Sequence, residues 1–201
     1  MALRARHDDR TDRGRRDTSH EGGSSDSERP TKLEWELPIT IVGPLVGAAW
    51  EKHLYVDAKG TYREDLNAWE TAQIQAALAD PTLVGWLRNQ PRAPWAFTVP
   101  YRHGGRDKAH YPDFVIFRRH SDGILPDVLE PHSLAWEDTV EKARGMAEFA
   151  LRHGELFGRI DMLAEVNGRT CRLPLNNRET RDAVLRVEGP NGLRALFEAN
   201  G

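Results

Sequence analysis

Hydrophobic and polar positions divide this 201-residue chain into a polar N-terminal segment and a longer part with regular apolar runs. Residues 1–30 are rich in Arg, Asp, Ser and Gly and hold very few apolar side chains. Ordering such a segment costs more conformational entropy than its burial would recover. We therefore expect residues 1–30 to be a disordered tail, residues 31–64 an N-terminal extension and residues 65–201 a folded domain.

The spacing of apolar residues in the domain predicts helices and strands in alternation. Apolar positions three and four apart predict helices over 65–78, 138–153 and 177–187, and Pro81 predicts the start of a short helix over 82–87. Short apolar runs predict strands over 95–101, from Asp113, around Asp127, over 159–166 and over 170–175. Asn167-Gly168 between the last two is a strong hairpin signal. This order predicts a mixed α/β domain with one central sheet flanked by helices.

Composition narrows the class of protein. The formal net charge of -3 gives no global basic field of the kind that favours free-standing nucleic-acid binding. Cys171 is the single cysteine, which excludes an internal disulfide and a cysteine-based zinc cluster. The sequence lacks an apolar run near the roughly 20 residues that a membrane helix needs. We expect a cytoplasmic protein without a membrane span.

Acidic side chains next to two of the predicted strands carry the candidate chemistry. Asp113 opens one strand, and Glu130 and His132 stand two residues apart at the end of the next. Side chains two apart on a strand share a face, so Glu130 and His132 should point the same way. If the strands are neighbours, Asp113 and Glu130 converge, and two buried carboxylates repel each other unless a cation or a proton lies between them. The pattern indicates a divalent-metal site.

These motifs resemble those of a nuclease superfamily. Glu70 on a helix, Pro112-Asp113 at a strand start, and Glu130 followed two residues later by a polar residue resemble the PD-(D/E)xK nucleases. Over about residues 65–185 the chain is also similar to the C-terminal region of type III restriction (Res) subunit-like helicase proteins. The motifs behind that similarity are Trp69-Glu70, 85–89, 95–101, 111–114, 127–132, 142–147, 153–154 and 157–160. The chain has no helicase phosphate loop, so a motor would reside on another chain.

The resemblance implies a restriction-endonuclease-like fold and hydrolysis of phosphodiester bonds in DNA. Asp113 and Glu130, joined by Glu70, would bind Mg²⁺ or Mn²⁺, because carboxylate oxygens suit these cations. It further implies a restriction or phage-defence system, with a helicase or other ATPase chain as partner. Cleavage of both strands of a duplex usually needs two sites, which makes a homodimer a further expectation.

One position departs from the superfamily pattern, which places Lys two residues after Glu130, where this chain has His132 preceded by Pro131. Histidine is mostly neutral at pH 7, so His132 would serve as general base or metal ligand and not as a permanent cation. Lys142 and Lys108 are alternative sources of that charge. Two basic segments are candidate DNA-contacting loops, although solvated loops would have the same composition. Their residues are Arg102, Arg106, Lys108, Arg118 and Arg119.

Other interpretations remain open at this point. Asp113 could be a strand-entry turn residue, Glu70 could lie on a solvated helix face, and Lys142 could pair with Asp138 one turn earlier. A non-catalytic relative would keep the fold as a DNA-binding or assembly module. The missing lysine and the negative net charge of the chain favour this alternative. An unrelated hydrolase would bind zinc through Asp113, Glu130 and His132. The nuclease interpretation requires that the two carboxylates converge and that no fixed cationic side chain fills the gap.

Overall fold

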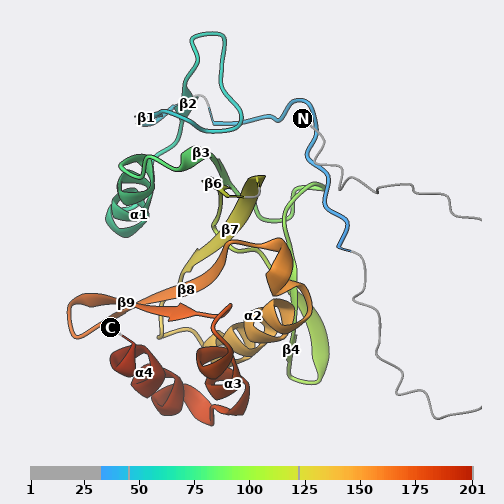
Figure 1. Cartoon of the computed structure of the whole chain (residues 1–201), viewed down its shortest axis with the longest axis vertical. Coiled ribbons are helices and arrows are strands. Elements are labelled where there is room, and N and C mark those ends of the chain that lie inside the picture. Colours follow the sequence, from blue (N-terminus) through green and yellow to red (C-terminus); the bar gives the residue numbers. More distant parts are fainter. Residues whose placement is uncertain (1–32, 45, 122, 201) are drawn as a thin grey trace, which may run out of the picture.

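The computed structural model describes residues 33–44, 46–121 and 123–200, so the predicted disordered tail lies outside the described residues (Figure 1). Five strands form the central sheet in the order β3-β6-β7-β8-β9. Neighbouring strands are antiparallel except β7 and β8, which are parallel and are connected through helix α2. The strands are β3 (Leu83–Arg88), β6 (Phe114–His120), β7 (Gly123–Pro131), β8 (Arg159–Val166) and β9 (Arg169–Pro174), and α2 is Thr139–His153.

Helices cover both faces of this sheet, with α1 on one side and α2, α3 and α4 on the other (Figure 1). This arrangement confirms the predicted mixed α/β class with a central sheet flanked by helices, and it does not conflict with a restriction-endonuclease-like fold. No helix among the described residues is long and apolar enough to cross a membrane. The remaining elements are β1 (Ala49–Trp50), β2 (Tyr62–Arg63), α1 (Ala68–Leu78), β4 (Val99–His103), β5 (Arg106–His110), the 3₁₀ helix η1 (Gly154–Leu156), α3 (Arg178–Arg186) and α4 (Gly189–Ala199).

Alternating side chains of the strands pack into two separate hydrophobic cores, one on each face of the sheet. Val115 and Val128 point to the face covered by α2, while Phe114 and Leu129 belong to the cluster on the α1 face. Both cores exclude water from the strands between them, and apolar burial contributes roughly 25 cal/mol per Å² to stability. Residues 114–117 of β6 and 127–131 of β7 are therefore buried on both sides, while the hairpin end of the pair is exposed.

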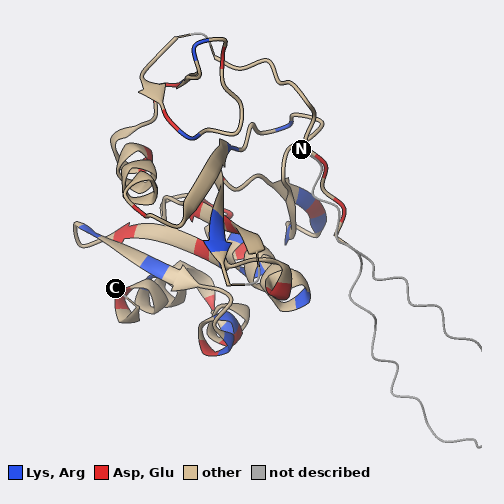
Figure 2. Ribbon diagram, turned by 45° about the horizontal axis from the view of Figure 1, so that its top comes forward, with Lys and Arg blue, Asp and Glu red and all other residues tan. Residues whose placement is uncertain are grey.

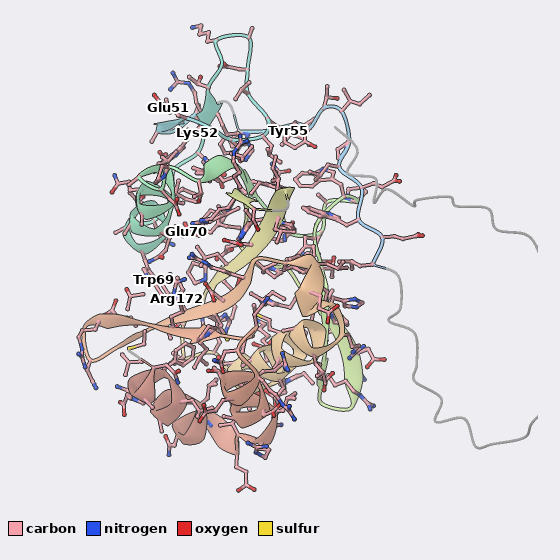
Figure 3. All side chains as sticks on the ribbon, in the orientation of Figure 1. Glu51, Lys52, Tyr55, Trp69, Glu70 and Arg172 are labelled. Atoms are coloured by element: carbon pink, nitrogen blue, oxygen red, sulfur yellow. The ribbon has the colours of Figure 1, made fainter. Side chains whose placement is uncertain are left out.

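The N-terminal extension closes the outer edge of β3. The Leu54 N–H donates to the Trp86 carbonyl at 2.8 Å, and the Trp86 N–H donates to the Lys52 carbonyl at 3.0 Å. The Trp86 indole donates to the carbonyl of Glu51, which Figure 3 labels beside Lys52 in this segment. An edge strand that would otherwise expose its hydrogen-bonding groups is thus partly paired.

The structure corrects several of the expected elements. The short helix expected over 82–87 is wrong: these residues form β3, because β6 and the extension pair with both of its edges. The strand expected over 95–101 begins only at Val99 and reaches His103. Strand β5, which pairs with β4, was not predicted because its residues are mostly polar and exposed. Helix α4 was not predicted either. Helices α1, α2 and α3 and the β8–β9 hairpin confirm their predictions to within a few residues.

Replacement of Gly145 by Ala should lower stability, although Ala normally stabilises a helix by about 1 kcal/mol relative to Gly. A Cβ atom at Gly145 would lie 2.6 Å from Tyr101 Cβ and 2.8 Å from the Pro100 carbonyl oxygen. We expect the free energy of unfolding, measured by urea denaturation, to fall by about 1–3 kcal/mol. Gly154→Ala is the control, because a Cβ atom at Gly154 would lie 3.9 Å from Asn176 Nδ2, an ordinary van der Waals distance. Equal effects of the two substitutions would contradict this close packing of α2 on β4.

Candidate active site

The register of the β6–β7 pair brings the two predicted acidic residues together. Phe114 pairs with Leu129, so Asp113 lies at the end of β6 next to Glu130 on β7. The Asp113 backbone N–H donates to Glu130 Oε2 at 3.0 Å. Glu130 is only 4% exposed. The two residues are neighbours, but the Glu130 carboxyl group contacts the backbone of Asp113, while the Asp113 carboxylate pairs with Arg88.

His132 lies on the same side of β7 as Glu130, as the two-residue spacing predicted. His132 Nδ1 is hydrogen-bonded to Glu130 Oε1 at 3.0 Å, and Nε2 is hydrogen-bonded to Thr139 Oγ1 at 3.2 Å. The His132 N–H donates to the Leu163 carbonyl on β8. His132 is buried and held on all sides, so it does not hang over an open cleft beyond Pro131.

His110 is a buried polar neighbour that the sequence did not reveal as a site residue. Its Nε2 atom lies 3.4 Å from Glu130 Oε1 and has no hydrogen-bond partner among the described residues. Its side chain is 6% exposed. His110 is the last residue of β5, a strand that was not predicted because its residues are mostly polar. The β4–β5 hairpin brings His110 next to Glu130.

Arg88 at the end of β3 joins three carboxylates across the α1 side of the sheet. Its guanidinium lies 2.9 Å from Glu70 Oε1, 3.3 Å from Asp113 Oδ1 and 3.6 Å from Glu64 Oε1. Glu70 projects from α1 toward the sheet and also caps the helix by accepting from the Asn67 N–H (Figure 3). Glu70 is therefore not on a solvated helix face. Arg88 and Glu64 were missing from the sequence-based set.

Burial shifts the protonation of the central groups. Burial raises the pKa of Glu130 to about 8. Burial, followed by the charge of Glu130, raises the pKa of Asp113 to about 7. Burial lowers the pKa of His132 to about 4 and that of His110 to about 3. At neutral pH both histidines are thus uncharged, and Glu130 is mostly protonated.

Lys142, an alternative cation, is held by other partners. Its ammonium group lies 3.1 Å from Asp138 Oδ1 and 5.0 Å from the centre of the Trp136 ring. The helical ion pair expected as the alternative role of Lys142 is therefore present. The same ammonium charge lowers the pKa of both His110 and His132, which shows that Lys142 remains within electrostatic reach of the site.

The predicted DNA-contacting residues separate into two groups. Arg102, Arg106 and Lys108 are exposed on the β4–β5 hairpin, where Arg102 pairs loosely with Asp107. The Arg118 side chain is 11% exposed and forms ion pairs with Asp80 and Asp127. Arg119, the next residue of β6, is exposed. Figure 2 shows acidic and basic residues side by side on the β4–β5 hairpin, where Asp107 lies between Arg106 and Lys108. Only the hairpin presents several predicted basic residues together.

The carboxylates offer the oxygen ligands that Mg²⁺ and Mn²⁺ prefer, but they are arranged around Arg88. Glu70 Oε1 and Asp113 Oδ1 both face the guanidinium. Within the described ranges, no group of three or more His, Cys, Asp or Glu side chains is placed to hold a metal ion. The donor atoms suit a hard divalent cation, but Arg88 is a cationic side chain fixed among these carboxylates, which the nuclease interpretation required to be absent. Binding a cation would require Arg88 to release these oxygens. Zinc fits less well, since both nitrogens of His132 already have partners.

The raised pKa of Glu130 should make its contribution to stability depend on pH. The group has a pKa of about 8 in the fold and 4.5 as its ordinary value, so the unfolded chain binds fewer protons between these values. The contribution of Glu130 to the free energy of unfolding should then fall as pH rises from 5 to 8, with a limiting slope of about 1.4 kcal/mol per pH unit. It is the difference between the wild type and Glu130→Gln, because the shifted pKa values of Asp113, His110 and His132 add their own pH dependence to both proteins. In urea denaturation with EDTA, Glu130→Gln should lose this slope, whereas Glu148→Gln, a change at an exposed residue, should keep it. A pH-independent difference between the wild type and Glu130→Gln would contradict the shift.

Comparisons with known proteins identify relatives of the chain. The chain is 31% identical over 166 residues to "Protein YagJ" of Escherichia coli (strain K12), and the alignment covers 82% of this chain and 64% of that protein. The chain thus spans less than two thirds of the length of this curated relative. No solved structure matches. The predicted relationship to the PD-(D/E)xK and type III restriction proteins stays a prediction. The YagJ family model matches residues 51–201, and the chain belongs to the YagJ family.

Proposed function

We propose that this chain is a metal-dependent DNA endonuclease that hydrolyses phosphodiester bonds. The observation that carries the proposal is the gathering of Asp113, Glu130 and His132 at one end of the β6–β7 pair, with Glu70 reaching Asp113 through Arg88. The order of one helix, three antiparallel sheet strands, a crossover helix and a parallel strand supports the proposal, because the resemblance to PD-(D/E)xK nucleases implies a similar order.

Asp113, Glu130 and Glu70 would hold Mg²⁺ or Mn²⁺ in this proposal. When bound, such an ion lowers the pKa of a water molecule and stabilises the leaving oxyanion. His132 is neutral in the metal-free site and can accept a proton. Ionisation of Glu130, 3.0 Å from its Nδ1, would favour the protonated imidazole. His132 is the proposed general base, and because both of its ring nitrogens already have partners, one of these hydrogen bonds must break before it can take a proton from the attacking water.

The proposal extends to the setting in which the chain acts. DNA is the proposed substrate, with a helicase or other ATPase chain as partner in a restriction or phage-defence system in the cytoplasm. Two copies of the chain would be needed to cut both strands of a duplex at one place. The resemblance over about residues 65–185 is what supports these features.

A non-catalytic DNA-binding or assembly module is the second candidate function. The ion pairs of Arg88 favour it, because a guanidinium already satisfies the carboxylates that would have to bind a metal ion. Such a protein would keep the fold and the exposed basic hairpin without hydrolysing DNA. The two candidates differ in whether DNA is cut, not in whether it is bound.

Cleavage of plasmid and single-stranded DNA by the purified chain tests the first candidate. We expect slow nicking with Mn²⁺ or Mg²⁺. Asp113→Asn and Glu130→Gln should each reduce it by at least about 100-fold, because loss of a residue that only supports a metal ligand already costs up to about 100-fold. Asp161→Asn is the matched control, because Asp161 is an equally buried carboxylate that pairs with Arg172 away from the site.

The outcomes separate the two candidates. Activity that survives both substitutions, or that all three substitutions reduce equally, would contradict the assignment of Asp113 and Glu130. A wild type that binds DNA but does not cut it with either metal would overturn the nuclease proposal and favour the non-catalytic module.

Both candidates predict that the β4–β5 hairpin contributes to DNA affinity. Replacement of Arg106 and Lys108 together by Glu should weaken binding of a labelled duplex and reduce the slope of log affinity against log salt by about 1 for each lost phosphate contact. The control replaces Arg178 and Arg186, both exposed on α3, by Glu, an equal change in net charge. Equal losses in the two variants would show a general charge effect and no role for the hairpin.

A further inference from the structure

We propose that Thr139 is a positioning residue that fixes the tautomer of the His132 ring, with the hydrogen on Nε2 and with Nδ1 as the nitrogen that accepts a proton. The inference rests on the proposed function and deepens it, because it decides which nitrogen of the proposed general base takes the proton. The tautomer itself follows from the directions of hydrogen bonds around Thr139 and requires neither a metal ion nor DNA.

The hydroxyl group of Thr139 is committed to the backbone of the turn before α2. Thr139 is the first residue of that helix and is buried. Its Oγ1 atom lies 2.7 Å from the Trp136 carbonyl oxygen and 3.2 Å from the Ser133 carbonyl oxygen. Carbonyl oxygens only accept, and 2.7 Å is the usual distance for a hydroxyl that donates to oxygen. The single hydroxyl hydrogen of Thr139 is therefore donated to this turn, and by distance to Trp136.

Toward His132, the Thr139 oxygen can act only as an acceptor. His132 Nε2 lies 3.2 Å from Thr139 Oγ1. A ring nitrogen without a hydrogen would present its lone pair to an oxygen that has no hydrogen left to give. His132 Nε2 must therefore carry a hydrogen and donate it to Thr139, an assignment made from the hydrogen-bond network.

The other ring nitrogen faces a carboxyl oxygen. His132 Nδ1 lies 3.0 Å from Glu130 Oε1, and both side chains are buried. In the neutral ring with its hydrogen on Nε2, Nδ1 has a lone pair, so this contact needs a proton from the carboxyl group. Glu130 Oε2 accepts from the Asp113 N–H, which leaves Oε1 to provide that proton. Glu130 thus donates to Nδ1, and Nδ1 is the acceptor in the resting site.

The opposite tautomer would fit Glu130 but not Thr139. With the hydrogen on Nδ1, the ring would donate to an ionised Glu130, and Nε2 would face the Thr139 oxygen without a hydrogen between them. Glu130 can pair with either tautomer because a carboxyl group can lose its proton. Thr139 is therefore the residue that distinguishes the two states, which a threonine kept for packing alone would not do.

The tautomer determines how His132 acts as a base in the proposed reaction. The hydrogen bond that opens is the one between Nδ1 and Glu130, after the Glu130 proton has passed to solvent. Nδ1 then takes one proton from the attacking water, and Nε2 keeps its own hydrogen on Thr139. The ring therefore stays attached to α2 while its charge changes, and its orientation is preserved through the proton transfer.

Nitrogen-15 NMR of the histidine rings in the whole chain tests the inference. Long-range proton–nitrogen spectra distinguish ring nitrogens that carry a hydrogen from those that do not, and the His132 ring is assigned through its own backbone signals. In the wild type at pH 7 with EDTA, we expect a hydrogen on Nε2 and an unprotonated, hydrogen-bonded Nδ1. An unprotonated Nε2, or hydrogens on both nitrogens, would overturn the inference.

Substitutions of Thr139 separate this role from packing. Thr139→Val removes the hydroxyl at nearly equal volume and should change the ratio of the two tautomers by about 5-fold toward Nδ1–H, the effect of one lost hydrogen bond. Thr139→Ser keeps the hydroxyl and should retain the wild-type spectrum. The matched control is Thr180→Val, because Thr180 is a buried threonine in the first turn of α3, and it should leave the His132 signals unchanged.

An unchanged tautomer ratio in folded Thr139→Val would overturn the inference, as would equal changes in Thr139→Val and Thr180→Val. If the valine variant does not fold, the spectra of the wild type and of Thr139→Ser still decide, because a serine variant with the opposite tautomer contradicts the role of the hydroxyl.

Failure of this inference and failure of the proposed function are distinguishable. If the wild type nicks DNA, Thr139→Val should lower the rate at saturating DNA by about 10-fold and leave KM within about 2-fold, since it affects the base and not DNA binding. A wild type that never cuts DNA but has the expected tautomer would remove the nuclease and keep the role of Thr139. Cleavage by a wild type with the opposite tautomer would keep the nuclease and remove that role.

Discussion

The burial of the Glu130 carboxyl group constrains the rest of the site. A carboxylate without compensating partners is costly inside a protein, so the chain must either neutralise it or surround it with donors. The Asp113 N–H and the His132 ring contact its two oxygens, and its pKa is raised to about 8. These contacts require that β6 begin opposite Leu129 and that the chain after β7 continue beside β8 to His132. The strand register and the buried acid therefore depend on each other.

Local patterns in the sequence predicted the elements whose character does not depend on distant partners. Helix α2 has a regular apolar stripe, and Asn167-Gly168 sets the β8–β9 turn. The segment 82–87 has a short apolar run that fits a helix or a strand equally well. Its strand state is decided by pairing with β6 and with residues 52–54, which no local pattern contains. Strand β5 escaped prediction because its exposed side chains lack an apolar alternation.

The candidate site divides in the same way. The period of two along β7 predicted that Glu130 and His132 share a face, and the structure confirms it. Arg88, Glu64 and His110 came from segments whose position depends on long-range contacts, so their roles could not be derived from spacing. Arg88 did lie within the motif 85–89 that supported the resemblance, which was the available signal. A charged residue closing a buried strand is a reason to look for buried carboxylates opposite it.

Asp113 connects two chemically different halves of the site. On the α2 side, Glu130 and the neutral histidines form a hydrogen-bonded group that can hold or accept protons. On the α1 side, Arg88 and its carboxylates form a charged group. The Asp113 backbone contacts the first and its side chain contacts the second. Any ligand that changes the pairing of Asp113 with Arg88 must therefore also change the electrostatic field at Glu130, whose pKa the Arg88 charge already lowers.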